Sequence, residues 1–188
     1  MTHIDICFSN KIMDCLCRMI GLNFVKFRAD PFVFSNSVFE RVGIYTSDRV
    51  YLLKNTLHTI DYFGSQEDIC GLEWYEVTET EIHSGLENTT QVDTLINRTI
   101  KEIHVVQEEQ TLVRDLASIY ELCFTRGILF IMDDGYEISF EMTNPFVETI
   151  AIRRGRNLID GYTPIRSDDN DWPDGCKLKT NRTIDVLR

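Results

Sequence analysis

A chain of 188 residues with 43% hydrophobic and 26% charged residues is long enough to bury a core and has a globular composition, which excludes wholesale disorder. Its net charge of −11 excludes a surface suited to DNA, RNA or anionic lipid, because the phosphates of these partners repel carboxylates. We expect a single domain over residues 1–188, rich in β-structure because Phe, Tyr, Ile and Val are frequent.

The first predicted elements are a short strand at 4–8 and an amphipathic helix after it. Ser9 or Asn10 can cap a helix that runs to Ile20, and Gly21 stands where a left-handed residue commonly ends a helix. Apolar residues recur along this segment at helical spacing, with charged residues on the opposite face. The helix is therefore expected to pack on the rest of the fold.

Strands are predicted for the next stretch. Residues 22–28 alternate between apolar and polar side chains, and residues 37–53 are typical of a hairpin that turns near 47–48. A loop with two aromatic residues at 61–65 leads to a further strand at 69–77.

The polar segment 79–93 is the predicted connector between two halves of the chain, 13–78 and 92–153. Each half is expected to run helix, strand, hairpin, strand, with the second helix at 92–100. Short sequence matches at an offset of 81 residues link the halves. They raise the hypothesis of an internal duplication.

The clearest feature is a hairpin whose turn is Asp133-Asp134-Gly135. The apolar run at 128–132 before the turn predicts a strand buried on both faces. The residues after the turn alternate with a period of two, as in a strand with one packed face and one wet face. The inward residues would be Tyr136, Ile138, Phe140 and Met142, and the outward ones Glu137, Ser139 and Glu141.

The last predicted strand is 148–153, its charged end carrying the arginines at 153–156, and a loop-rich tail follows at 155–188. The predicted fold class is α+β, predominantly antiparallel β: a curved sheet or open barrel with the N-terminal helix packed on it. The strands at 128–132 and 42–45 are expected to share the core.

No local motif indicates an enzyme. The sequence contains no GxSxG, no glycine-rich phosphate loop and no CxxC, and its four histidines are scattered, so we assign no catalytic residue, no cofactor and no metal site. The acidic loop at 168–175 departs from the EF-hand pattern because no glutamate closes it. The open alternative is an enzyme whose site assembles from distant residues, which His104 beside two carboxylates would indicate.

The six cysteines are expected to be reduced thiols in a cytoplasmic protein. The N-terminal residues lack the basic start and long apolar core of a signal peptide, and no window approaches the ~18 apolar residues of a membrane span.

The acidic charge is unevenly distributed, because the interval between Lys54 and Arg98 contains no Lys or Arg. Such a surface would attract a basic protein, and an aromatic side chain ringed by acids is a typical anchor at an interface. Trp74 and Trp172 are the candidate anchors. The competing interpretation is that both tryptophans pack at the edge of the core and that the acidic residues form an ordinary solvated face. The predicted partner-binding residues are Asp61, Glu67, Asp68, Glu73, Trp74, Glu76, Glu79 and Glu81.

A small acidic domain of hairpins without a catalytic motif is similar in layout to small bacterial proteins, some of which neutralise toxins, although no motif is specific to such a family. The leading hypothesis is a non-enzymatic, protein-binding module such as an immunity-type protein, with its oligomeric state left open. The alternative is a small-molecule-binding or sensory domain with a site inside the β fold, lined by residues such as Phe130, Tyr136 and Phe140.

Overall fold

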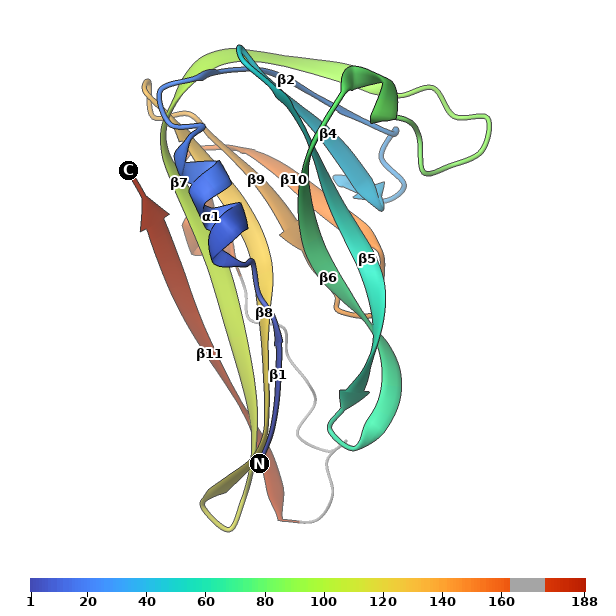
Figure 1. Ribbon diagram of the computed structural model, residues 1–188, viewed down its shortest axis with the longest axis vertical. Helices are drawn as coiled ribbons and strands as arrows, with labels where there is room; N and C mark the ends of the chain where they lie inside the picture. Colours follow the sequence, from blue (N-terminus) through green and yellow to red (C-terminus); the bar gives the residue numbers. More distant parts are fainter. Residues whose placement is uncertain (163–174) are drawn as a thin grey trace.

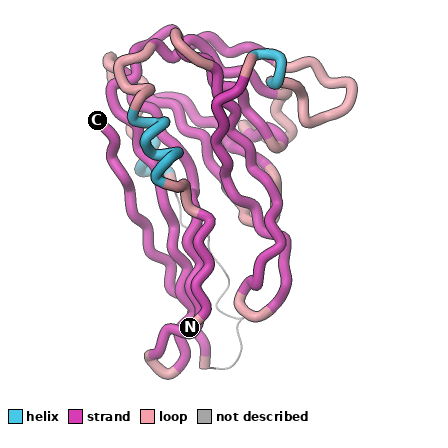
Figure 2. The backbone as a smooth tube through the Cα atoms, viewed as in Figure 1, coloured by secondary structure: helices cyan, strands magenta, loops and turns pink. Residues whose placement is uncertain are grey.

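The structure, a computed structural model, describes residues 1–162 and 175–188, and strands make up most of that part of the chain (Figures 1 and 2). They form one sheet in the order β3-β10-β9-β8-β7-β2-β4-β5-β6, with β1 added beside β8 and β11 beside β7. The elements are β1 (Thr2–Ile6), α1 (Asn10–Cys17), β2 (Asn23–Ala29), β3 (Ser37–Phe39), β4 (Arg41–Thr46), β5 (Val50–Tyr62), β6 (Ser65–Val77), η1 (Glu79–Glu81), β7 (Val92–Arg114), β8 (Ala117–Met132), β9 (Glu137–Met142), β10 (Thr149–Gly155), η2 (Leu158–Gly161) and β11 (Cys176–Leu187).

The sheet is strongly curved and open. The ring centroids of Trp74 on β6 and Phe130 on β8 lie 6.4 Å apart, although β5, β4, β2 and β7 separate these two strands within the sheet. The strand order ends at β3 and β6, which do not pair with each other, and the one parallel pair among the described strands is β1–β8. The predicted class, a mostly antiparallel and curved sheet with one helix, is confirmed at this level.

The core lies inside the curve and is filled by aromatic and branched side chains. Phe24 on β2 packs edge-on against Phe130, with their ring centroids 5.2 Å apart. Phe27 packs in the same way against Phe140, with a centroid distance of 5.7 Å. Ile44 belongs to the same buried cluster, so β4 and β8 share one core as expected. Burial of this apolar surface is the main favourable term in folding.

The N-terminal helix is shorter than the sequence predicts. Helix α1 ends at Cys17, and the Met19 N–H donates to the Leu16 carbonyl in a tighter turn. Gly21 has φ 84°, the left-handed conformation expected of it, and its N–H donates to Ile100 of β7 at 2.8 Å. The chain therefore leaves the helix early in order to enter the sheet at β2.

The helix predicted at 92–100 is wrong, because this segment is the first part of the 23-residue strand β7. The segment pairs with β2 in an antiparallel ladder that runs from Val92 opposite Ala29 to Thr99 opposite Asn23. A left-handed residue, Asn97 with φ 50°, lies where the register shifts. Pairing with β2 outweighs the weak local preference for a helix. The internal duplication stays a prediction.

The tail at 155–188 is not irregular throughout. Strand β11 pairs with β7 in register from Cys176 opposite Arg114 to Leu187 opposite Ile103. The acidic run around Asp169, most of the predicted loop at 168–175, and Trp172 lie outside the described residues. Within the described ranges, no helix is long and apolar enough to cross a membrane.

The central hairpin is confirmed, and Gly135 adopts φ 77° in its turn. The segment at 61–65 is tighter than the predicted loop, since Phe63 and Gly64 alone form the turn between β5 and β6, both with positive φ.

The predicted wet face of β9 is wrong for Ser139 and Glu141, which are 0% and 4% exposed. The ring of Tyr162, just after η2, comes so close to Gly127 that a Cβ there would lie 2.7 Å from the Tyr162 hydroxyl. This cover turns the second face of the sheet into a buried polar layer.

A row of charged side chains crosses five neighbouring strands in this layer. Glu141 forms an ion pair with Arg153 and accepts a hydrogen bond from the Ser139 hydroxyl at 3.1 Å. Glu108, with no exposed surface, lies 3.7 Å from both Arg126 and Arg182. From β11 to β10 the row reads Arg182, Glu108, Arg126, Glu141 and Arg153.

Candidate protein-binding surface

The predicted partner-binding residues all lie on β5, β6 and η1, but they separate into two groups. Asp61, Glu67 and Asp68 lie at the tip of the β5–β6 hairpin, where Ile60 pairs with Glu67 and Thr59 with Asp68. The other group lies near the far end of β6 and on η1: Glu73, Trp74, Glu76, Glu79 and Glu81.

The acids of the second group already have partners within the chain. Glu76 forms an ion pair with Arg49, and Glu79 lies 3.2 Å from Arg28. Glu73 accepts a hydrogen bond from the Tyr75 hydroxyl at 2.7 Å and lies 3.6 Å from His58.

Glu81 caps η1, where hydrogen bonds from the Thr78 N–H and hydroxyl lower the pKa of its carboxyl. With these contacts in place, the second group offers less uncompensated charge to a partner than the sequence implies.

The three acids at the tip form no ion pair within the described residues. Asp61 accepts the Gly64 N–H at 2.7 Å, which fixes the turn, and Asp68 accepts the Thr59 hydroxyl at 2.6 Å. Glu67 and Asp68 are exposed. Neutral donors orient Asp61 and Asp68 without cancelling their charge, so the end of the β5–β6 hairpin keeps three negative charges.

Trp74 is not an exposed anchor. Its side chain points into the core, where it is 5% exposed and stacks on Tyr51 at 5.2 Å. Leu72, two residues earlier on the same face of β6, belongs to the same core cluster. The competing interpretation of Trp74 as a packing residue is therefore correct, while Trp172 lies outside the described ranges.

Phe146, in the loop between β9 and β10, supplies the exposed aromatic side chain instead. It is 51% exposed and packs edge-on against Tyr62 at 5.5 Å. Tyr62 contacts Phe63 at 4.7 Å, and Phe63 contacts Tyr120 at 4.4 Å. We call Asp61, Tyr62, Phe63, Glu67, Asp68 and Phe146 the acidic–aromatic tip.

The loop that carries Phe146 is held in place by its backbone. The Cys70 N–H donates to the Pro145 carbonyl at 2.7 Å, and the Asn55 amide donates to the Val147 and Thr149 carbonyls at 3.2 and 3.1 Å. The tip is therefore a pre-organised surface.

Burial, together with Tyr120 and Glu67 nearby, raises the pKa of Tyr62 to about 12. Tyr62 is therefore a neutral support for Phe146 at physiological pH. An apolar ring next to carboxylates suits the long side chains of Lys and Arg, whose stems are apolar and whose heads are charged.

His104, the residue considered for an enzyme, contacts one carboxylate in the described ranges. His104 Nε2 contacts Glu102, which also pairs with Arg188 at 2.8 Å, and these contacts lower the pKa of Glu102. No second carboxylate among the described residues contacts His104. Glu102 thus bridges His104 and Arg188.

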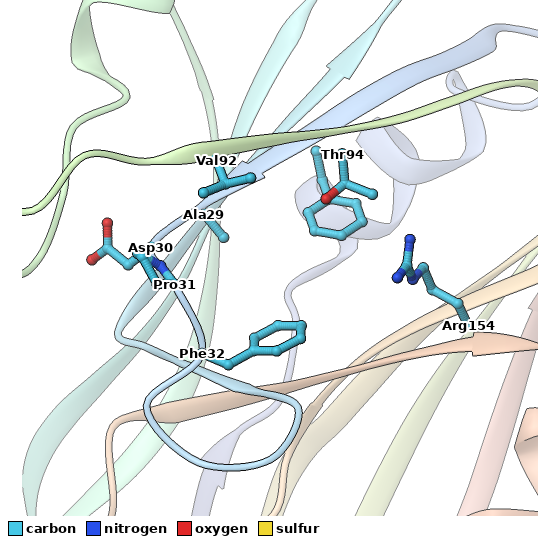
Figure 3. A pocket seen from close by; sticks show the side chains of 8 residues that line it. Ala29, Asp30, Pro31, Phe32, Val92, Thr94 and Arg154 are labelled. Atoms are coloured by element: carbon cyan, nitrogen blue, oxygen red, sulfur yellow. The ribbon is translucent and has the colours of Figure 1, made fainter.

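A pocket in the described part of the chain lies at the end of β2, between the 30–32 loop, the start of β7 and Arg154 of β10 (Figure 3). Phe32 and Arg154 point toward it from opposite sides. Its volume of about 190 Å³ is below the roughly 300–1,000 Å³ of most ligand sites.

The residues named for a site inside the β fold do not line this pocket. Phe130 and Phe140 pack against each other at 6.1 Å in the core, and Tyr136 lies under the Arg98 guanidinium at 4.1 Å.

Family models, curated proteins and solved structures gave no match to this chain. The functional argument therefore rests on the chemistry of the surfaces described above.

Proposed function

We propose that this protein is a non-enzymatic, protein-binding module, of the immunity type that neutralises a basic partner, and that the acidic–aromatic tip is its docking surface. One observation carries the proposal: three carboxylates without an ion-pair partner in the described chain lie at the end of the β5–β6 hairpin, where Tyr62 contacts the half-exposed ring of Phe146. The ring supplies an apolar anchor, and the acids supply the charge.

In such a surface, the acidic side chains and the aromatic side chain act on different steps of binding. Carboxylates at the rim raise the rate of encounter with a basic surface, and an aromatic side chain that becomes buried slows dissociation. The rest of the molecule adds to the attraction, since its net charge is −11. Charge steering acts over about 10 Å at 0.1 M salt, so binding should weaken as salt rises.

A small-molecule-binding domain is the alternative, and the pocket beside Phe32 is where a ligand would bind (Figure 3). The proposal does not rest on it, because the pocket is small and open.

Affinity capture from the lysate of the source cell tests the proposal. The full-length protein would be attached through its C-terminus, which Figure 1 places far from the β5–β6 tip. We expect a basic protein to be retained at low salt and released at high salt. The triple variant Asp61→Asn, Glu67→Gln, Asp68→Asn should lose most of this protein.

A charge-matched control separates the tip from the overall charge. The triple variant Asp14→Asn, Asp48→Asn, Glu87→Gln changes net charge equally at exposed positions outside the tip. It should retain the partner as the wild type does. Equal losses in both variants, or no basic protein retained by the wild type, would show that the tip is not a docking surface.

A further inference from the structure

Two cysteines and an aspartate far apart in the sequence meet beside strand β1. β1 pairs with β8 in parallel, with Asp5 opposite Cys123 and Ile6 opposite Phe124. Cys7 follows the last residue of β1. The ligand atoms of Asp5, Cys7 and Cys123 all lie within 4.8 Å of one another. The sequence could not indicate this cluster, because 116 positions separate the cysteines.

The cluster lies on the side of the sheet away from the core. Leu122 and Phe124, the neighbours of Cys123 on β8, belong to the core cluster, so Cys123 projects to the other side. Both cysteines are partly exposed free thiols, and Asp5 is exposed. A solvated ion can therefore reach all three side chains.

The contacts within the cluster orient the three ligand groups toward a common point. The Cys7 thiol lies 2.8 Å from the Cys123 sulfur and donates to it. One oxygen of Asp5, Oδ1, accepts the Cys7 N–H at 2.9 Å, and the Asp5 side chain also interacts with the Cys7 thiol.

The hydrogen bond from Cys7 lowers the pKa of Cys123 and raises that of Cys7, to which burial adds. Asp5, Glu109 and Glu121 lie near enough to act on the charge of Cys123, so the surroundings are negative and favour a cation.

We propose that Asp5, Cys7 and Cys123 bind a thiophilic divalent cation of the Zn²⁺ class, with water as the fourth ligand. Two sulfur ligands and one carboxylate suit Zn²⁺ rather than Mg²⁺ or Ca²⁺, which take oxygen ligands. Binding releases the thiol protons, because the coordinating sulfur atoms are thiolates.

The geometry needs one small adjustment. With Zn–S bonds of about 2.3 Å, tetrahedral coordination holds two sulfur atoms roughly 3.8 Å apart, so the sulfurs must separate by about 1 Å. Cys7 lies beyond the last residue of the β1 ladder, so a rotation of its side chain can make this movement without disturbing the ladder. The bound ion would fasten the five-residue N-terminal strand to β8.

Titration of the reduced, metal-free, full-length protein with Co²⁺ tests the site. Thiolate ligands give Co²⁺ a sulfur-to-metal charge-transfer band, and tetrahedral geometry gives it intense visible bands. We expect both in the wild type, with loss of the bands on addition of Zn²⁺. Cys7→Ser and Cys123→Ser should each lose the two-thiolate spectrum, and Asp5→Asn should weaken binding by about tenfold or more.

Cys17→Ser is the matched control, because Cys17 is an exposed thiol on α1 outside the cluster. It should bind Co²⁺ as the wild type does. The proposal is overturned if the reduced wild type gives no thiolate band, or if the band keeps its full two-thiolate intensity in Cys7→Ser and Cys123→Ser.

The competing chemistry is a disulfide, which needs a two-electron oxidant to accept the electrons of the two thiols. Mass spectrometry after exposure to oxidised glutathione detects it as the loss of two hydrogens. A disulfide that forms in a protein unable to bind Co²⁺ when reduced would assign the pair to redox chemistry and contradict the metal site.

Discussion

Asp93 shows how a single side chain joins two strands. It lies at the start of β7, opposite Arg28 of β2, and its Oδ1 accepts the Arg28 Nε–H at 2.6 Å. Lys26 contacts the other oxygen at 2.6 Å. These contacts, that of Arg28 first, lower the pKa of Asp93 from 3.8 to about 2. The pairing therefore supports the segment that sequence reasoning assigned to a helix.

The depressed pKa predicts a pH dependence. Because the pKa of folded Asp93 lies below its unfolded value, its contribution to stability is complete above about pH 5 and is lost as pH falls from about 4 to about 2. The difference in free energy of unfolding between wild type and Asp93→Asn, measured by urea denaturation, should shrink over this range. Since 38% of the Asp93 side chain is exposed, salt should reduce the difference too. A difference that is constant from pH 7 to pH 2 would contradict the assignment.

At the scale of elements, the alternating charges beneath Tyr162 tie β11, β7, β8, β9 and β10 together. Arg182 donates to the Tyr162 carbonyl, and the guanidinium groups of Arg153 and Arg182 lie 5.0 and 5.9 Å from its ring. Burial lowers the pKa of Arg126 and raises that of Tyr162. Buried charged side chains are tolerated only while each has an oppositely charged neighbour.

Neutralising one member of the row should therefore be costly. Glu141→Gln removes the charge that pairs with Arg153 and acts on Arg126, and we expect a loss of about 3–5 kcal/mol in the free energy of unfolding. Glu137→Gln, on the same strand but less buried, is the matched control and should cost less than about 1 kcal/mol. Chemical denaturation of both variants checks the prediction. Similar losses would mean that the row does not stabilise the fold.

The elements with a strong local pattern were predictable from the sequence, and those determined by distant pairing were not. The Ile128–Met132 run and the turn at Gly135 have their own signals, and both are present in the central hairpin. Strand β11 has no such signal, because its residues become a strand by pairing with β7. Glu141 follows the alternation of an exposed strand, yet Tyr162 buries its face.

At the scale of the whole molecule, the sequence indicated the acidic interval but not which of its acids remain without a cation. That depends on Arg28 and Arg49, which come from outside the interval and pair with Glu79 and Glu76. Phe146 could not be foreseen either, because it reaches the tip from the loop after β9. Curvature of the sheet brings these segments together.

The most direct test of the docking surface is the association rate of the captured partner, measured at two salt concentrations. The account predicts that the wild type associates faster at low salt. The variant Asp61→Asn, Glu67→Gln, Asp68→Asn should associate about tenfold more slowly there, with a weaker salt dependence. Equal association rates and equal salt dependence for the two proteins would contradict the account.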